Sequence, residues 1–289
     1  MPRLMAVLNA SPDSFSGGAI DPATVAGRAR AAVDGGATVL DVGGQSLRTD
    51  QPEIPVAEEL ARTVPVVAAC RAGLADLPGG PGGIDISVDT YRAPVAAEAI
   101  AAGATIVNDP SGLRDRDLVD LVASTGVGLV LAYNRSVPKI RLAASELVDD
   151  PVTDGLAFLT ERLDALVAAG VREEQVVVDP GPDLGKSPAQ TIDVLRSLHR
   201  FRSLGRPLLL ALSRKDFIGA VTMTAPPDRE AGLFGVLAAL HLGPDDLLRV
   251  HEPERIRDFY LLRSVLDGSA EVDPDLELPM HLRHVTRPA

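Results

Sequence analysis

Several kinds of residue are scarce in this 289-residue chain, and each scarcity excludes a class of protein. Cys70 is the only cysteine, which excludes a disulfide framework and fits a reducing cytoplasm. Lys and Arg number 28 against 40 Asp and Glu, so the net charge of −12 argues against general nucleic-acid binding. Tryptophan is absent and aromatic residues make up 3%, so Ala, Val and Leu must fill the core.

Long apolar runs are also absent. No run approaches the roughly 20 residues that a membrane-spanning helix needs. The N-terminal segment Met1–Leu8 is too short and too quickly polar for a signal peptide. We therefore expect neither a membrane partner nor secretion. Cys70 lies in an apolar helical pattern, which predicts a buried packing residue rather than a nucleophile.

What the chain does contain is an alternation of short apolar runs and longer helical patterns. The runs, each long enough for one buried strand, are Leu4–Leu8, Thr38–Val42, Ile84–Val88, Thr105–Val107, Gly128–Leu131, Gln175–Val178, Pro207–Leu212 and Leu247–Val250. The helical patterns are Pro22–Asp34, Val56–Ala75, Ala93–Ala101, Arg116–Ser124, Val152–Ala168, Thr191–Arg202, Arg229–His241 and Pro253–Leu266. This alternation predicts βαβ units and a parallel sheet.

Eight such units favour a closed (β/α)8 TIM barrel of the α/β class. An open parallel sheet is the alternative. The length suits one domain, which we place at residues 1–267, followed by a solvated extension at 268–289. Unbroken apolar runs, without polar alternation, are typical of strands buried on both faces.

The predicted strands end in polar residues, and Leu208–Gly219 is the clearest example. Its apolar run stops at Ser213, and two cations and an acid follow. In a parallel barrel all strands end at one face, where active sites lie. One acid at a strand end is usually a helix cap. Eight polar strand ends predict a binding site instead.

Three of these residues carry hydrogen-bond acceptors. Asp89, Asn108 and Asp179 follow the third, fourth and sixth predicted strands. A carboxylate accepts two parallel N–H bonds from a flat, amidine-like edge. The three side chains therefore suit a heterocycle rich in N–H donors, and Lys215 suits a ring carbonyl.

Positive charge gathers at the same face. Arg48, Arg249 and His251 suit an anionic group. Asn9, an uncharged oxygen ligand, suits Mg²⁺ that is shared with a phosphate. A structural metal site is not predicted, because no His/Cys cluster has ligand spacing.

These strand ends make the chain similar to a known family, the dihydropteroate synthases, which are pterin-binding (β/α)8 enzymes of folate synthesis. The resemblance runs from Leu8 to Asp267. Its motifs are Asn9–Phe15, Asp41–Arg48, Ser87–Ala93, Asn108-Asp109, Asp179–Lys186, Ser213–Gly219 and Arg249–His251. It implies condensation of 6-hydroxymethyl-7,8-dihydropterin pyrophosphate with p-aminobenzoate, with release of pyrophosphate.

The resemblance also implies the roles of the site residues. Asp89, Asn108, Asp179 and Lys215 would hold the pterin. Asn9, Arg249 and His251 would hold the pyrophosphate, with Mg²⁺ as cofactor at Asn9. Phe15 and Arg48 would close over the second substrate. Lys215, Arg249 and His251 would take part in the chemistry, and the family's barrels are often homodimers through their outer helices.

The chain departs from the family pattern around the pterin residues and in the second-substrate loop. The departures are Gln45 for Glu, Leu47 for Thr, Thr49 for Pro, Ala132-Tyr133 for Met-His, Asp183 for Gly, Leu184 for an aromatic residue and Asp216 for Ser. At about 5 Å from a benzoate carboxylate, Asp216 would cost about 3 kcal/mol at an effective dielectric near 20. Alternatively, Asp216 pairs with Arg214 or caps the following helix.

Two other functions stay open at this stage. The first is a diverged paralogue that binds the pterin pyrophosphate but uses another amine, or none. The second is a pterin-dependent methyltransferase domain that serves a corrinoid partner. Arg48, Arg249 and His251 argue against the second, because methyl transfer needs no pyrophosphate site.

Overall fold

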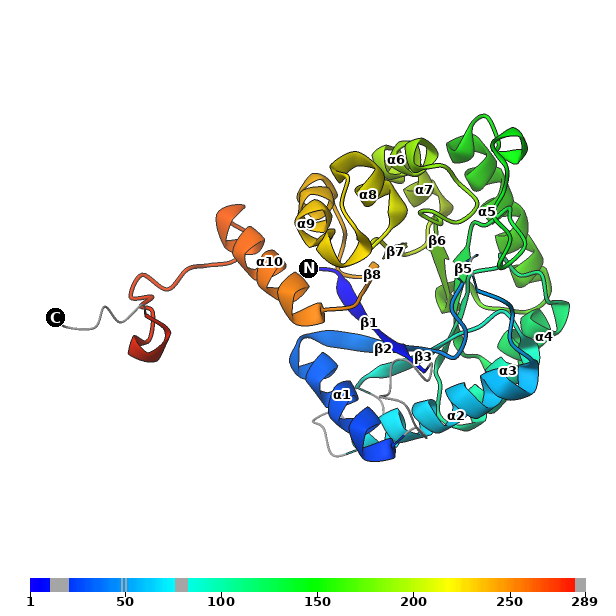
Figure 1. Ribbon diagram of the computed structural model, residues 1–289, viewed down its shortest axis with the longest axis horizontal. Coiled ribbons are helices and arrows are strands. Elements are labelled where there is room, and N and C mark those ends of the chain that lie inside the picture. Colours follow the sequence, from blue (N-terminus) through cyan, green and yellow to red (C-terminus); the bar gives the residue numbers. More distant parts are fainter. Residues whose placement is uncertain (11–20, 48, 50, 76–82, 284–289) are drawn as a thin grey trace.

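Eight parallel strands form the centre of the structure, a computed structural model that describes residues 1–10, 21–47, 49, 51–75 and 83–283. The strands are β1 (Arg3–Asn9), β2 (Ala37–Gly43), β3 (Asp85–Asp89), β4 (Ile106–Asp109), β5 (Gly128–Ala132), β6 (Val176–Asp179), β7 (Leu209–Ala211) and β8 (Leu247–Val250). They pair in the order β6-β5-β4-β3-β2-β1-β8-β7. A parallel bridge from Val178 of β6 to Leu208, the residue before β7, joins the two edges of the sheet. The predicted barrel is thus confirmed, and the open sheet is wrong (Figure 1).

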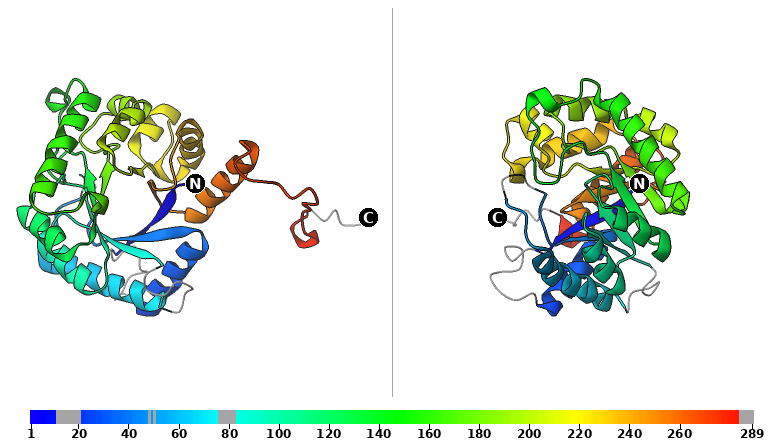
Figure 2. Two further views of the ribbon diagram at one scale, coloured as in Figure 1. Left: turned by 180° about the vertical axis from the view of Figure 1, so that it is seen from behind. Right: turned by 90° about the vertical axis from the view of Figure 1, so that its right-hand side faces the viewer.

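Helices surround the strands on the outside (Figures 1 and 2). They are α1 (Pro22–Asp34), α2 (Val56–Gly73), α3 (Ala93–Ala101), α4 (Arg116–Thr125), α5 (Pro151–Ala168), α6 (Pro188–Arg196), α7 (Leu198–Phe201), α8 (Asp216–Thr222), α9 (Glu230–Ala239) and α10 (Pro253–Leu266). Beyond α10, the described chain runs away from the barrel.

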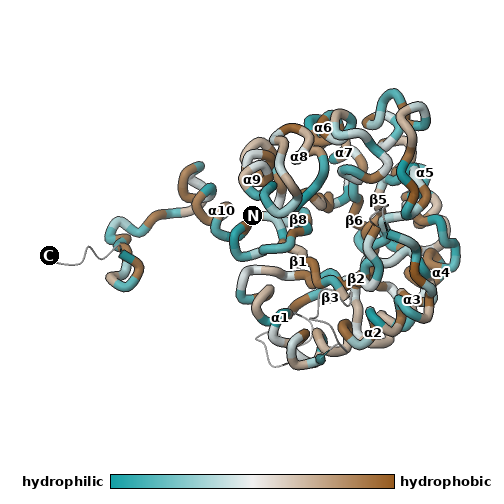
Figure 3. The backbone as a smooth tube through the Cα atoms, viewed as in Figure 1, coloured by the Kyte–Doolittle hydropathy of each residue, from teal (hydrophilic) through white to brown (hydrophobic). Residues whose placement is uncertain are grey.

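Both faces of the strands are apolar, as the unbroken runs predicted. The side chains that point outward pack under the helices and form the larger core. A smaller core lies inside the barrel and consists of Met5, Val39, Val130, Leu209 and Leu247, one residue from each of five strands. In Figure 3 brown and teal stretches alternate along the surrounding helices, which have one face on the barrel and one in water.

Several element boundaries differ from the predicted ones. The predicted helix Thr191–Arg202 is interrupted at Ser197, which ends α6 and begins α7. β7 is three residues long, although the apolar run around it has six. α8 was not among the predicted helical patterns, because seven residues are too few to show a helical period.

Two further predictions concern buried and membrane-spanning segments. Cys70 is completely buried on α2, and burial raises the pKa of its thiol to about 12, so it is a packing residue as predicted. Among the described residues, no helix combines the length and apolar character that crossing a bilayer requires.

Candidate active site

An arginine bound to two acids lies at the carboxyl ends of the central strands. Arg249 of β8 donates from Nε to Asp41 of β2 at 2.6 Å and from Nη2 to Asp89 of β3 at 2.7 Å. The side chain of Asp41 is fully buried, and that of Asp89 is 13% exposed. Burial raises the pKa of Asp89 to about 7, although the Arg249 charge opposes the rise. This site therefore holds two acids and one cation largely out of contact with bulk water, and the Arg249 side chain is 22% exposed.

β4 brings Asn108 to the same group. Its Nδ2 donates to Asp41 Oδ2 at 3.2 Å. The other Asp41 oxygen, Oδ1, and the hydroxyl of Ser87, which lies opposite Asp41 on β3, are buried, and neither has a hydrogen-bond partner among the described residues. Asp109, the next residue, accepts the amides of Ser111 and Leu113, both at 2.7 Å, and so holds the turn after β4. Asp41, which was not among the predicted ligands, is thus the residue that joins Asn108 to Arg249.

Asp179 ends β6 and begins a tight loop. Its Oδ1 accepts the amide of Gly181 at 2.7 Å, and burial raises the pKa of the carboxyl. That rise in pKa is opposed by the positive charges of Lys215, Lys186 and Arg249. Asp179 therefore interacts electrostatically with the Arg249 group. Gly181 has a φ of 69°, and a Cβ there would lie 2.1 Å from the Tyr133 carbonyl oxygen. Only glycine allows the loop to approach β5 this closely.

Lys186 fastens the same loop from its far end. Its Nζ donates to the carbonyls of Tyr133, Gly181 and Leu184 at 3.2, 2.9 and 3.0 Å, and lies 3.9 Å from the Tyr133 ring centre. Burial lowers the pKa of Lys186 to about 7. Tyr133 is buried and donates to Asp154 at 2.6 Å. At the end of β5, where the family pattern has Met-His and this chain has Ala132-Tyr133, the structure therefore places an aromatic ring against Lys186.

The Asp216 side chain lies at the start of α8 and points into solvent. It is 81% exposed and pairs with Arg229 at 2.9 Å. The predicted pairing of Asp216 with Arg214 is wrong, because Arg214 pairs with Glu252 at 3.3 Å. Lys215, the preceding residue, donates from Nζ to the Pro182 carbonyl at 3.0 Å.

His251 lies two residues beyond Arg249, and its Nδ1 is 2.9 Å from the hydroxyl of Ser213. Burial lowers the pKa of His251 to about 4, and the Arg214 and Arg249 charges add to the effect. His251 is therefore neutral at pH 7 in this state and acts as a hydrogen-bonding group rather than a cation. The contact between Ser213 and His251 was not predicted from the sequence.

Asn9 is exposed at the carboxyl end of β1. It is the one predicted metal ligand, and its neighbour across the sheet is Gly43 of β2. The predicted second-substrate residues Phe15 and Arg48 lie outside the described residues. The structure thus brings Asp89, Asn108 and Arg249 into one bonded group and places Asp179 within its field.

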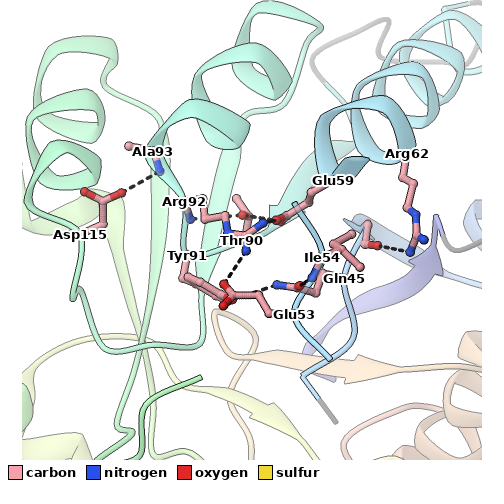
Figure 4. Close-up of polar contacts among 11 residues, drawn as sticks. Gln45, Glu53, Ile54, Glu59, Arg62, Thr90, Tyr91, Arg92, Ala93 and Asp115 are labelled. Carbon is pink, nitrogen blue, oxygen red and sulfur yellow. Dashed lines mark hydrogen bonds and ion pairs between the residues drawn. The ribbon is translucent and has the colours of Figure 1, made fainter. Parts of the chain in front are cut away.

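A second polar network fixes the segment after β2 (Figure 4). The amide of Gln45 accepts the Ile54 N–H at 2.8 Å and donates to the Tyr91 hydroxyl at 2.9 Å. Tyr91 in turn donates to Glu53 at 2.7 Å. Gln45 and Tyr91 each donate one hydrogen bond and accept one, and an ionised glutamate at position 45 could not donate to the Tyr91 hydroxyl. The departure from Glu to Gln is therefore explained by its partners.

The network continues to the start of α2. Arg92 pairs with Glu59 at 2.7 Å and also with Glu53, and Thr90 donates to the other Glu59 oxygen at 2.7 Å. The Glu59 side chain is 1% exposed. Because Thr90 and Arg92 are one and three residues after Asp89, this buried ion pair joins the end of β3 to α2.

Comparisons with known proteins agree with the barrel and its strand ends. A family model described as pterin binding enzyme matches residues 5–251. Dihydropteroate synthase of Bacillus subtilis is 36% identical over 259 residues, which cover 88% of this chain and 84% of that protein. Dihydropteroate synthase of Escherichia coli K12 is 31% identical over 253 residues, with 87% and 86% covered.

Solved structures give the same match in three dimensions. Xanthomonas albilineans dihydropteroate synthase with 4-aminobenzoic acid is 33% identical, with a TM-score of 0.79 and 92% and 93% of the two chains covered. The same enzyme in complex with 7,8-dihydropteroate is 32% identical, with a TM-score of 0.78 and 92% and 94% covered. The likeness therefore spans the whole barrel.

Proposed function

Because this chain belongs to the dihydropteroate synthase family of pterin-binding enzymes, we propose that it joins a dihydropterin to p-aminobenzoate in folate biosynthesis. The chain is a transferase of the dihydropteroate synthase type. The observation that carries the proposal for this chain is the bonded group at the barrel mouth. Asp89, Asn108 and Asp179 present acceptors there, next to Arg249.

The acceptors account for pterin binding. A pterin carries adjacent N–H groups on its amino-pyrimidine edge, and a carboxylate accepts two such bonds in parallel. Asp179 has one oxygen committed to Gly181, which fixes the orientation of the carboxylate. Burial keeps these acceptors away from water, so a pterin meets groups that are already oriented.

Arg249 and His251 are proposed to stabilise the leaving group. In the proposed step, the bond between the pterin methylene carbon and the pyrophosphate oxygen breaks, and its electron pair leaves with pyrophosphate. The amine nitrogen of the second substrate forms the new bond and gives up a proton to the departing pyrophosphate or to water. Arg249 supplies positive charge to the departing oxygens, and neutral His251 supplies an N–H. No covalent enzyme intermediate is needed.

Mg²⁺ belongs to the proposal as a cofactor. The fit rests on Asn9, an exposed amide at the end of β1, because Mg²⁺ commonly takes one or two protein oxygens and completes its shell with phosphate and water. Among the described residues, no group of three His, Cys, Asp or Glu could hold the ion alone. When bound, Mg²⁺ would neutralise charge on the pyrophosphate.

The second substrate is proposed as p-aminobenzoate despite Asp216. That carboxylate is 81% exposed and paired with Arg229, so water and the guanidinium both weaken its field. The repulsion of about 3 kcal/mol expected for an unpaired acid at 5 Å is therefore an upper limit. The roles predicted for Phe15 and Arg48 remain part of this proposal.

A cytoplasmic homodimer is proposed as the working form. Three leucines on the outer face of α10 support the dimer, since Leu261, Leu262 and Leu266 are 55%, 61% and 78% exposed. Neighbouring exposed leucines on one helix are typical of a surface that a partner covers.

The experiment that tests the function measures pyrophosphate release from 6-hydroxymethyl-7,8-dihydropterin pyrophosphate with and without p-aminobenzoate. We expect release that depends on p-aminobenzoate, and dihydropteroate as product. Asp179→Asn should abolish it, whereas Asp193→Asn on the outer face of α6 should retain it. Release that needs a different amine would support the diverged paralogue instead. No release with any amine would overturn the proposal.

A further inference from the structure

Asp183, in the loop after β6, has an unusual backbone conformation. Its φ is 60°, in the left-handed region that favours glycine. Glycine is also the residue that the family pattern has at this position. Asp is one of the few other residues that tolerates the conformation, but it is still unfavourable. A side chain that stays here in spite of that cost needs compensating contacts.

The Asp183 side chain makes those contacts with α8 and α6. Its Oδ2 accepts the amide of Asp216 at 2.5 Å and that of Phe217 at 3.3 Å. Its Oδ1 accepts the hydroxyl of Thr191 at 3.0 Å, and its own amide donates to the same hydroxyl at 3.1 Å. Thr191 is completely buried, so one end of the bridge is fixed in the core.

α8 depends on this carboxylate, because the helix has no side-chain cap of its own. The first four amides of any helix lack partners within the helix. At α8 the N-cap residue is Lys215, whose side chain makes no capping bond. The cap is supplied instead from another loop, 33 residues earlier in the sequence.

The same two loops are joined a second time, in the reverse direction. Lys215 Nζ donates to the carbonyl of Pro182, the residue before Asp183. One side chain from each loop thus bonds to the other loop's backbone. The Lys215 charge reaches Asp179, whose pKa it lowers against the effect of burial. The start of α8 is therefore held against the loop that carries the predicted pterin acid.

We infer that Asp183 is a positioning residue for Lys215. This inference rests on the proposed function, in which Lys215 meets a ring carbonyl of the pterin. By capping α8 from the β6 loop, Asp183 fixes the backbone from which Lys215 extends, and so keeps the ammonium at the Pro182 carbonyl, in the loop that Asp179 begins. The β6 loop, which carries Asp179, and the start of α8, which carries Lys215, then form one rigid unit.

Asp183→Gly is the informative variant. It removes the cap and at the same time relieves the unfavourable φ, so the two effects on stability oppose each other. The readout is the affinity for 6-hydroxymethyl-7,8-dihydropterin pyrophosphate, measured by titration calorimetry. We expect about tenfold weaker binding, which is the size of one hydrogen bond to a charged group. Asp183→Asn keeps an acceptor and tolerates the same φ, so it should restore most of the affinity.

Two controls separate positioning from folding. In a Lys215→Met background, Asp183→Gly should weaken binding no further, because its effect passes through Lys215. Asp150→Gly removes a comparable cap, since Asp150 accepts the Val152 and Thr153 amides at 3.0 Å each at the start of α5. That variant should lose stability and keep its affinity.

The outcomes distinguish this inference from the proposed function. If the unchanged protein does not bind the dihydropterin pyrophosphate, the proposed function fails, and the role of Asp183 fails with it. If the unchanged protein binds but Asp183→Gly has no effect, or adds fully to Lys215→Met, only the positioning role is overturned. Weaker binding that vanishes in the Lys215→Met background supports it.

Discussion

Replacing Arg249 with Met tests the energetic centre of the barrel mouth. The guanidinium makes two short, charge-assisted bonds, to the fully buried Asp41 and to Asp89. A hydrogen bond to a charged group contributes about 1.5–3 kcal/mol. Removing one partner of a buried pair costs about 3–5 kcal/mol, because the remaining charge has no compensation. We expect Arg249→Met to lower the free energy of unfolding by about that amount at pH 8.

The loss of stability in Arg249→Met should depend on pH, and the pKa of Asp89 determines the direction of that dependence. Burial raises that pKa to about 7, and the Arg249 charge holds it down. Without the arginine the pKa rises further, so Asp89 of the variant keeps its proton at pH values at which Asp89 of the unchanged protein has lost it and pairs with Arg249. The variant should therefore be less destabilised at pH 6 than at pH 8.

Urea unfolding followed by far-ultraviolet circular dichroism suits this test, because the chain has no tryptophan. Arg255→Met is the matched control. Arg255 also pairs with two acids, Glu230 and Glu252, but its side chain is 55% exposed, so a loss below about 1 kcal/mol is expected. Equal losses in the two variants, or an Arg249→Met loss that is the same at both pH values, would refute the reasoning.

Three further predictions follow from single contacts. The pKa of His251 is about 4 in the folded protein and 6.5 in the unfolded chain, so its contribution to stability is complete above pH 6.5 and is lost as the pH falls to 4. His251→Asn should therefore reduce the change in the free energy of unfolding between pH 6.5 and pH 4 by up to about 3 kcal/mol. Gly181→Ala should lower stability by more than about 2 kcal/mol, seen as a lower melting temperature, because the Cβ meets the Tyr133 carbonyl at positive φ. Glu59→Ala should cost about 3 kcal/mol in urea unfolding, because it leaves Arg92 without its buried partner, and a loss below 1 kcal/mol would contradict the buried pair.

The barrel could be predicted because its strands are buried on both faces. Such strands give unbroken apolar runs, and β8 was predicted with its observed bounds, Leu247–Val250. The structure ends α4 at Gly126, whose φ is 71°, and a glycine in this conformation is a common helix end. α8 was missed because it has only seven residues and because its cap, Asp183, comes from another loop. A cap supplied from a distance leaves no local pattern.

The candidate site was predicted in part for the same reason. Parallel strands place their ends at one face, so polar strand ends identify the mouth without any knowledge of contacts. The pairing of those ends could not be predicted. Asp41 is the buried partner of Arg249, 208 residues away in sequence, and Asp216 pairs with Arg229 rather than the nearer Arg214. Nothing local distinguishes these partners from other acids and arginines.

The most direct measurement is titration calorimetry of 6-hydroxymethyl-7,8-dihydropterin pyrophosphate against the unchanged protein and Asp179→Asn. We expect the unchanged protein to bind the ligand and Asp179→Asn to bind it at least about tenfold more weakly, because an amide cannot accept two N–H bonds as a carboxylate does. Equal affinity of the two proteins, with both folded, would contradict the assignment of the barrel mouth as a pterin site.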